Sequence, residues 1–206
     1  MKKITIIAAA FTLFTTASFA QDWNWDKAHS QLNFSIVHMG INDIGGSFGS
    51  VTAKLTSAKE DFSDATVELS ADVNTINTGN EQRNNHLKSA DFFDAAQFGT
   101  LSFKSTSFKK VSGSNYKLTG DLTLHGVTKT VTLDVVYNGT ITNPQSKKPT
   151  AGFKVTGSIK RTDFGIACRF CCRCQRSITC AGDLPCAAAT SVITGSSSVD
   201  PWGPPR

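Results

Sequence analysis

Four histidines are the residues of this sequence best suited to acid–base or metal chemistry. They lie far apart, at His29, His38, His86 and His125, and no HExxH, GxSxG or phosphate-loop motif accompanies them. His29 and His38 could bind a metal together, but a single histidine in a strand is more often a hydrogen-bonded structural group. The sequence therefore predicts no catalytic centre and keeps a metal-dependent site near this pair as the alternative. His125, at a predicted turn, is interpreted as structural.

Arg83 and His86 lie three residues apart, a spacing at which side chains on a helix face the same way. Asn80 precedes them and can accept a hydrogen bond from the first helical turn, so we expect a short helix over residues 81–88. Two interpretations stay open. The pair forms a solvated helix face, or it contacts the polar head group of a bound molecule.

All six cysteines follow Ile166, so the fold of residues 21–166 cannot depend on a disulfide. They are Cys168, Cys171, Cys172, Cys174, Cys180 and Cys186. The first four are densely spaced, but the spacing matches no ordinary zinc pattern.

Three explanations compete for residues 167–206. They form a metal-binding segment, a disulfide-bonded appendix of an oxidising compartment, or a wrong reading frame that begins after Ile166. The abrupt change to a Ser-, Ala- and Pro-rich composition favours the frameshift. We expect this Cys-rich tail to be disordered and to form no part of a barrel. It has too few periodic apolar residues to offset the entropy of ordering.

The first twenty residues have the pattern of a Sec-type signal peptide. Lys2 and Lys3 precede a mostly apolar run over residues 4–16, and small residues near Ala20 favour cleavage before Gln21. The run is shorter than the ~20 residues that span a membrane, and no later segment is apolar enough. We therefore expect an exported, periplasmic protein whose mature chain has no transmembrane segment.

The net charge of +5 is concentrated at the two ends of the chain. The first twenty residues hold two lysines, and the part after Ile166 holds four arginines against two aspartates. Residues 21–166 are left with fifteen basic and fourteen acidic residues, a balance that gives no argument for binding nucleic acid. Their length suits one domain with one substantial core.

Residues 115–137 carry the clearest pattern, two alternating runs that meet at His125-Gly126. The apolar positions are Tyr116, Leu118, Leu122 and Leu124 in the first run and Val127, Val131, Leu133, Val135 and Tyr137 in the second. A period of two in adjacent runs predicts paired strands with one buried face. Gly126 can adopt the positive φ that a tight turn needs.

Other alternating segments predict further strands. They cover residues 32–38, 51–56, 65–73, 100–108 and 153–159, with a Gly-rich corner over 39–46 and a polar loop over 138–150. About seven strands with short connections indicate an antiparallel sandwich or closed barrel. Phe92, Phe93 and Phe98 interrupt the pattern, and either plug one end of the barrel as core or line the entrance to a ligand cavity.

Several stretches occur with the order and spacing seen in one known family. They are Trp25-Asp26, His29-Ser30, Phe34, Val37-His38-Met39-Gly40, Gly46-Ser47-Phe48-Gly49, Ile76, Thr78, Arg83, His86-Leu87, Ser89-Ala90-Asp91-Phe92-Phe93-Asp94, Gly120-Asp121-Leu122-Thr123-Leu124-His125-Gly126-Val127-Thr128-Lys129 and Arg161-Thr162-Asp163-Phe164-Gly165. Over residues 23–166 the chain thus resembles the YceI-like family of lipid-binding proteins. After Gly165 the resemblance stops, where the family continues into a closing strand.

The resemblance implies an all-β fold, a lipocalin-like antiparallel β-barrel of about eight strands with one short helical insertion. The last strand would be missing here. It also implies binding of a polyisoprenoid, quinone-like or fatty-acid-like lipid, often by a homodimer, and no enzymatic activity. The expected function is that of an exported lipid carrier without a cofactor other than a bound lipid. The alternatives are an enzyme acting on a small lipid or through a metal near His29 and His38, and a scaffold with a fully packed barrel.

We expect a set of apolar residues around a ligand, and inward parity selects those of the set that lie in strands. The whole set is Phe34, Ile36, Phe48, Val67, Leu69, Phe92, Phe93, Phe103, Leu122, Leu124, Val131, Leu133, Phe153 and Val155. Arg83, His86 and Arg161 are the expected contacts of a polar head group.

Overall fold

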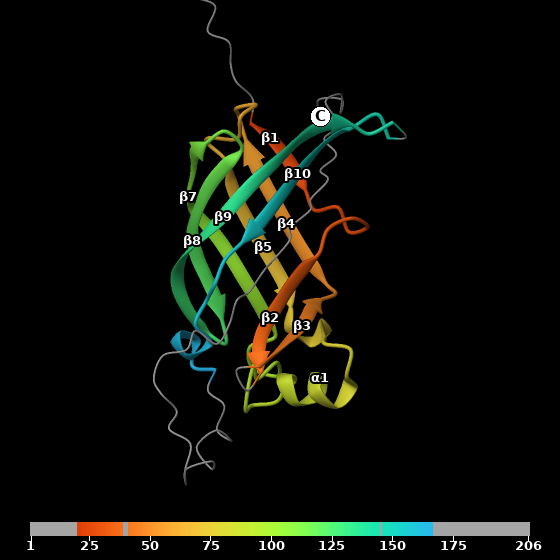
Figure 1. Ribbon diagram of the computed structural model, residues 1–206, viewed down its shortest axis with the longest axis vertical. Helices are drawn as coiled ribbons and strands as arrows, with labels where there is room; N and C mark the ends of the chain where they lie inside the picture. Colours follow the sequence, from red (N-terminus) through yellow and green to blue (C-terminus); the bar gives the residue numbers. More distant parts are fainter. Residues whose placement is uncertain (1–19, 39–40, 145, 167–206) are drawn as a thin grey trace, which may run out of the picture.

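The computed structural model describes residues 20–38, 41–144 and 146–166. The described chain is built mostly of strands, with one α-helix and two 3-10 helices (Figure 1). The strands are β1 (Gln21–Asn24), β2 (Leu32–His38), β3 (Asn42–Phe48), β4 (Val51–Ser57), β5 (Thr66–Asp72), β6 (Ile76–Asn77), β7 (Thr100–Ser112), β8 (Asn115–Leu124), β9 (Val127–Thr142) and β10 (Pro149–Thr156). The helices are η1 (Val73–Thr75), α1 (Glu81–Lys88) and η2 (Arg161–Phe164).

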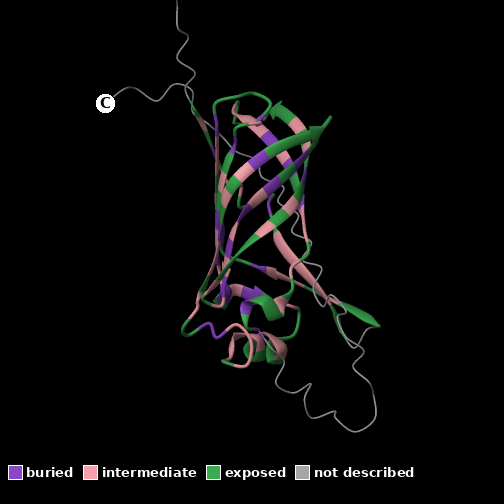
Figure 2. Ribbon diagram, turned by 90° about the vertical axis from the view of Figure 1, so that its left-hand side faces the viewer, coloured by how far each residue is buried: buried purple, intermediate pink, exposed green. Residues whose placement is uncertain are grey.

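Seven strands form one antiparallel sheet in the order β1-β4-β5-β7-β8-β9-β10. This sheet curls into an elongated half-barrel (Figure 1), and buried residues alternate with more exposed ones along strands such as β8 (Figure 2). A smaller sheet, β2-β3-β6, lies toward the lower end in Figure 1 beside α1. The expected all-β antiparallel fold with one short helical insertion is confirmed. The predicted signal peptide, the Cys-rich tail and the closing strand lie outside the described residues.

The hairpin of β8 and β9 follows the predicted alternation. Leu124 pairs with Val127, and the turn between them has positive φ at both His125 (52°) and Gly126 (72°). Two left-handed residues match the twist of the flanking strands, which explains a glycine here. A Cβ on Gly126 would also lie 2.5 Å from the ring of Phe98. His125 Nδ1 lies 3.1 Å from the carbonyl oxygen of Phe164, so this histidine joins the turn to η2.

The predicted Gly-rich corner over residues 39–46 is wrong from Asn42 onward, because the chain forms β3 and pairs with β2 there. Phe34 lies opposite Gly46, and a Cβ on Gly46 would come within 2.4 Å of the Phe34 ring. This glycine therefore makes room for an aromatic ring across a strand pair, and does not turn the chain.

The predicted polar loop over residues 138–150 is also too long. β9 continues to Thr142, and β10 begins at Pro149, which pairs with it. Proline is compatible with the first residue of a strand, where no ladder hydrogen bond is lost. The strand expected over 153–159 therefore lies earlier and ends at Thr156, and β7 extends to Ser112. With β1, β3 and β6 added, the described residues hold ten strands against about seven predicted.

Aromatic side chains pack together where the β4–β5 connection meets β1, β9 and β10. This connection lies at the upper end of the half-barrel in Figure 1. Phe62, in the connection, is only 2% exposed. Its ring centroid lies 5.3 Å from that of Trp23, 5.2 Å from that of Tyr137 and 5.1 Å from that of Phe153. We call these four residues the aromatic cluster. Such edge and tilted contacts add to the burial of large apolar surfaces and close this end.

Candidate functional site

A cavity of about 270 Å³ lies inside the half-barrel. Its lining reaches from Trp23 and Phe153 in the aromatic cluster to Arg83 and Arg161 near the other end. For comparison, an apolar cavity of ~150 Å³ is large enough to stay dry and bind benzene. The alternative of a fully packed barrel is therefore wrong.

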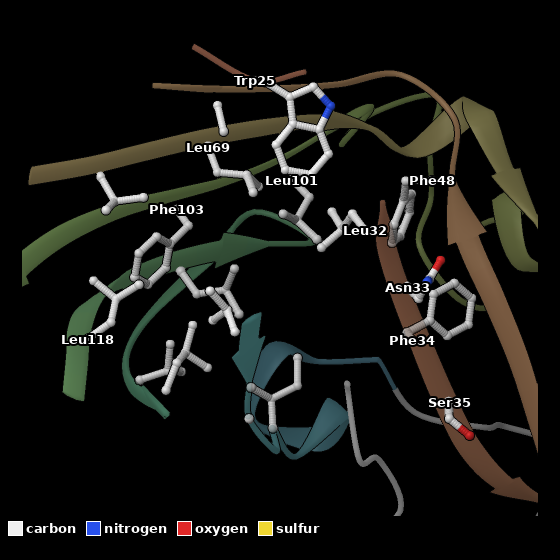
Figure 3. A pocket seen from close by; sticks show the side chains of 18 of the residues that line it. Trp25, Leu32, Asn33, Phe34, Ser35, Phe48, Leu69, Leu101, Phe103 and Leu118 are labelled. Carbon is white, nitrogen blue, oxygen red and sulfur yellow. The ribbon is translucent and has the colours of Figure 1, made fainter. Parts of the chain in front are cut away.

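The walls of the cavity come from inward positions on neighbouring strands. Leu69 on β5, Phe103 on β7 and Leu118 on β8 converge on one side, while Phe48 and Phe34 approach from β3 and β2 (Figure 3). Register explains the convergence, because Leu69 pairs with Phe103 across the β5–β7 ladder. Paired residues of antiparallel strands point to the same face, so every second pair along this ladder turns both of its side chains toward the cavity.

All of the apolar residues that were expected around a ligand line this cavity except Leu124. Leu124 is 4% exposed and stands at the last position of β8, next to the turn, where it packs as core. Phe92 and Phe93 line the cavity, whereas Phe98 instead packs its ring 4.9 Å from that of His125. The role of the lining residues as ligand contacts stays a prediction.

The sequence interpretation missed several residues of the lining. They are Trp23, Asn24, Trp25, Leu32, Asn33, Ser35, Ile44, Ala53, Lys54, Leu55, Thr78, Leu87, Leu101, Phe108, Leu118, Val135, Ala151, Gly157, Ile159 and Ile166. Leu101, Leu118 and Val135 share the parity of the predicted set and could have been found from it. Trp25 lies between β1 and β2, outside any strand, and Figure 3 shows its indole directed toward Leu101 and Leu32. No periodic signal marks such a residue.

Arg83 is held in place by hydrogen bonds at the edge of the cavity. Its Nε donates to Thr78 Oγ1 (2.7 Å) and its Nη2 donates to the Thr78 carbonyl oxygen (2.6 Å). Thr78 is itself fixed by Asn84, whose Oδ1 accepts from the Thr78 hydroxyl (2.7 Å) and backbone N–H (2.8 Å). Asn80 Oδ1 caps α1 by accepting from the Arg83 backbone N–H (3.0 Å), as expected. The helix and its cap thus determine where the guanidinium lies.

His86 does not line the cavity, so its expected place beside Arg83 is wrong. Its ring packs edge-on at 4.8 Å from Phe92, its Nε2 lies 3.9 Å from Asp91 Oδ2, and its side chain is 50% exposed. The three-residue spacing separates the two side chains enough around the helix for one to face the cavity and the other to face solvent. Arg161, at the start of η2, does line the cavity.

Three cationic residues, Lys54, Arg83 and Arg161, are part of the cavity lining, and no aspartate or glutamate among the described residues is. Lys54 Nζ pairs with Asp22 Oδ2 at 2.9 Å, and this contact is the main cause of a lowered pKa of the Asp22 carboxyl. Within the described part of the chain, neither arginine forms an ion pair.

The histidines of the metal alternative lie in exposed positions. His29 Nδ1 is 2.7 Å from Asp26 Oδ2 with a side chain that is 76% exposed, and His38 is exposed at the end of β2. Among residues 20–38, 41–144 and 146–166, no group of three or more His, Cys, Asp or Glu side chains could hold a metal ion. In the same ranges, no helix has the length and apolar character needed to cross a membrane.

Comparison with known proteins gives consistent matches. The model of the YceI-like domain family matches residues 23–181. A UPF0312 protein of Staphylococcus aureus strain MSSA476 is 39% identical over 145 residues, which are 70% of this chain and 82% of that protein. The crystal structure of a Campylobacter jejuni YceI protein superposes with a TM-score of 0.62 at 25% identity, covering 97% of this chain and 100% of that one.

A more distant structure shares the fold alone. It is a polyisoprenoid-binding domain from Saccharophagus degradans, described as implicated in plant cell wall breakdown. It superposes with a TM-score of 0.51 at 18% identity and covers 71% of this chain and 82% of that domain.

Proposed function

The chain belongs to the YceI-like family, and from that premise we propose that it binds the apolar chain of a lipid inside its half-barrel and carries or sequesters it. The observation that carries the proposal is the cavity, whose walls are mostly Phe, Leu, Ile and Val side chains. Burial of an alkyl or isoprenoid chain contributes about 0.8 kcal/mol per CH₂, less the cost of ordering the chain. The polyisoprenoid-binding domain of S. degradans, which shares the fold, supports this class of ligand.

The proposed ligand is a polyisoprenoid, a quinone-like lipid or a fatty-acid-like amphiphile. We also propose that the protein is exported to a periplasm after cleavage before Gln21, and that it can form a homodimer. The charge pattern of residues 1–20 supports export. Fractionation of cells, with mass measurement of the mature chain, tests the location and the cleavage site together.

We propose binding and not catalysis as the activity. The polar groups around the cavity are three cations and a few amides and hydroxyls, and no nucleophile–base pair stands among the described lining residues. Elemental analysis of the purified protein separates this proposal from the metal-dependent alternative. A stoichiometric metal that is lost on the substitution His38→Ala would favour the enzyme.

Organic extraction of the purified protein followed by mass spectrometry tests lipid binding directly. We expect an apolar lipid to be recovered, or a prenol or fatty-acid probe to bind to the emptied protein. If no lipid is extracted and no probe binds, the proposal is wrong.

A pair of variants on β9 tests whether the inner face holds the ligand. Leu133 lines the cavity, and its neighbour Thr132 is exposed on the outer face. Leu133→Asp should abolish probe binding, or folding itself, because a carboxylate without a partner would face an apolar wall. Thr132→Asp introduces the same charge on the outer face and should keep both. Equal behaviour of the two variants would contradict the assignment of the inner face.

A further inference from the structure

We propose that the end of the cavity formed by α1 and η2 is an oxyanion subsite, so that the ligand is an amphiphile with a carboxylate or phosphate head group. This inference rests on the proposed lipid-binding function and narrows its ligand to anionic members. A neutral quinone or alcohol would then be a weaker ligand.

The first argument for an oxyanion subsite is the charge of the residues that line the cavity. The charged residues among them are all cations, Lys54, Arg83 and Arg161, and no carboxylate of the described residues lines the cavity. Asp22 already neutralises Lys54, whose Nζ lies 2.9 Å from its carboxylate. The two arginines are left without a carboxylate partner in the described part of the chain. An arginine keeps its charge at any physiological pH, so this positive charge is permanent.

The second argument is the position of the two arginines at one end of the cavity. Arg83 lies on α1 and Arg161 lies on η2, the blue segment, and both elements stand at the lower end of the half-barrel in Figure 1. The aromatic cluster closes the opposite end. Between them the lining is predominantly apolar. The lining thus changes from apolar to cationic along the cavity. An amphiphile matches this change in one orientation, with its tail toward Phe153 and its head group beside the arginines.

The third argument comes from the hydrogen bonds of Arg83. Its Nε and Nη2 donate to Thr78, whose oxygens are neutral, so the contacts orient the guanidinium without cancelling its charge. Arg83 is half-buried and stands next to apolar groups such as Leu87. A charge that is partly removed from water is stabilised by an opposite charge more than by a neutral acceptor. The planar guanidinium also matches the two oxygens of a carboxylate or phosphate.

Three probes with the same sixteen-carbon chain test the inference: hexadecanoate, hexadecyl phosphate and hexadecan-1-ol. Binding to the full-length chain at neutral pH is followed by tryptophan fluorescence, since Trp23 and Trp25 line the cavity. We expect at least one anionic probe to bind about tenfold or more tightly than the alcohol, the value of a hydrogen bond to a charged group.

Variants locate the effect. Arg83→Gln and Arg161→Gln should each weaken the preferred anionic probe about tenfold and leave hexadecan-1-ol within about twofold. Arg83→Lys keeps the charge without the planar fork and should show a smaller loss. Lys88→Gln is the matched control, because Lys88 is a cation of the same helix that does not line the cavity, and it should bind all three probes as the wild type does. Circular dichroism verifies that each variant folds.

The outcomes separate the inference from the function on which it rests. Equal binding of alcohol and anions, or arginine variants that weaken all three probes equally, would overturn the oxyanion subsite while lipid binding stands. Failure of all three probes and of a polyprenol to bind would overturn both. A stronger response to hexadecyl phosphate supports a phosphate head group, and a stronger response to hexadecanoate supports a carboxylate.

Discussion

The two ends of the half-barrel use opposite chemistry around one shared apolar wall. At the upper end, four aromatic rings pack together and Phe62 retains 2% exposure. At the lower end, α1 has no buried residue, and two arginines line the cavity without an ion-pair partner among the described residues. Apolar walls supply affinity that grows with the length of the apolar chain of a ligand, but they discriminate little between head groups. The difference between the ends suggests that packed aromatic rings close one end and that head groups are recognised at the other.

Phe62 shows how strongly the upper end is constrained. Its φ is 56°, a left-handed conformation that is rare for a residue with a large side chain. Such a backbone persists only where surrounding contacts over-determine it, at a cost of about 1–3 kcal/mol. The contacts here are three aromatic rings within 5.3 Å of its own, between centroids.

The substitution Phe62→Ala should have the largest effect on stability. Removing the ring leaves a cavity among Trp23, Tyr137 and Phe153, and we expect the free energy of unfolding to fall by about 3–5 kcal/mol. Chemical denaturation monitored by circular dichroism measures the change.

Phe92→Ala provides the matched change at the lower end. Phe92 also lines the cavity but is only half-buried, so its loss should cost less than half as much. If both variants lost the same free energy of unfolding, the two ends would contribute equally to stability, which would contradict the difference proposed between them.

The wall between the ends was the part that the sequence predicted best. Strict alternation in β8 and β9 determined both the strands and their inward residues, and the glycine at 126 indicated the turn. These signals are local, because a period of two needs only neighbouring residues. β3 was missed for a related reason, since Gly45 and Gly46 look like turn residues until Phe34 is placed across from them.

The two ends were predicted less well, because their residues act through distant contacts. Phe62 lies in a connection with no periodic pattern, and only the fold brings it to Trp23 and Phe153. At the other end, helical spacing identified Arg83 but also included His86, which faces Asp91. Which of two neighbouring helix residues enters a cavity depends on how the helix docks, and the sequence does not specify that.

Lowering the pH should destabilise the upper end by protonating Asp61 and Asp64, which flank Phe62. The Ser57 hydroxyl donates to Asp64 Oδ1 (2.7 Å), with further help from the backbone N–H groups of Ala58 and Lys59, and these contacts lower the pKa of Asp64. The backbone N–H of Ser63 likewise lowers the pKa of Asp61. A carboxyl with a lowered folded-state pKa stabilises the fold above its unfolded pKa of about 4. That stabilisation is lost as the pH falls through the lower, folded value.

The variant Asp64→Asn tests how much the charge of Asp64 contributes to stability. It should unfold at a lower temperature than the wild type at neutral pH, and the difference should shrink as the pH falls below about 4, where the wild-type carboxyl also becomes neutral. Thermal unfolding at a series of pH values measures the difference. A gap between the two proteins that stays constant down to pH 2 would show that the charge of Asp64 contributes nothing to this end.

The smallest effect is expected from Thr78, the residue that orients Arg83. Thr78→Val keeps the shape of the side chain but removes the hydroxyl that accepts from Arg83 Nε, while the bond from Nη2 to the backbone carbonyl remains. Loss of one of two orienting hydrogen bonds should weaken hexadecanoate binding about threefold and leave hexadecan-1-ol unchanged.

Two further variants determine whether Thr78 acts through orientation of the arginine. Thr78→Ser restores the hydroxyl and should restore binding of hexadecanoate. Thr123→Val makes the same chemical change on the β8–β9 hairpin, where the hydroxyl pairs with that of Thr128 at 2.8 Å and does not line the cavity, and it should bind as the wild type does. If Thr78→Val weakened the alcohol as much as the acid, the loss would reflect the shape of the cavity. The lower end would then recognise ligands by fit rather than by charge, and the contrast between the two ends would disappear.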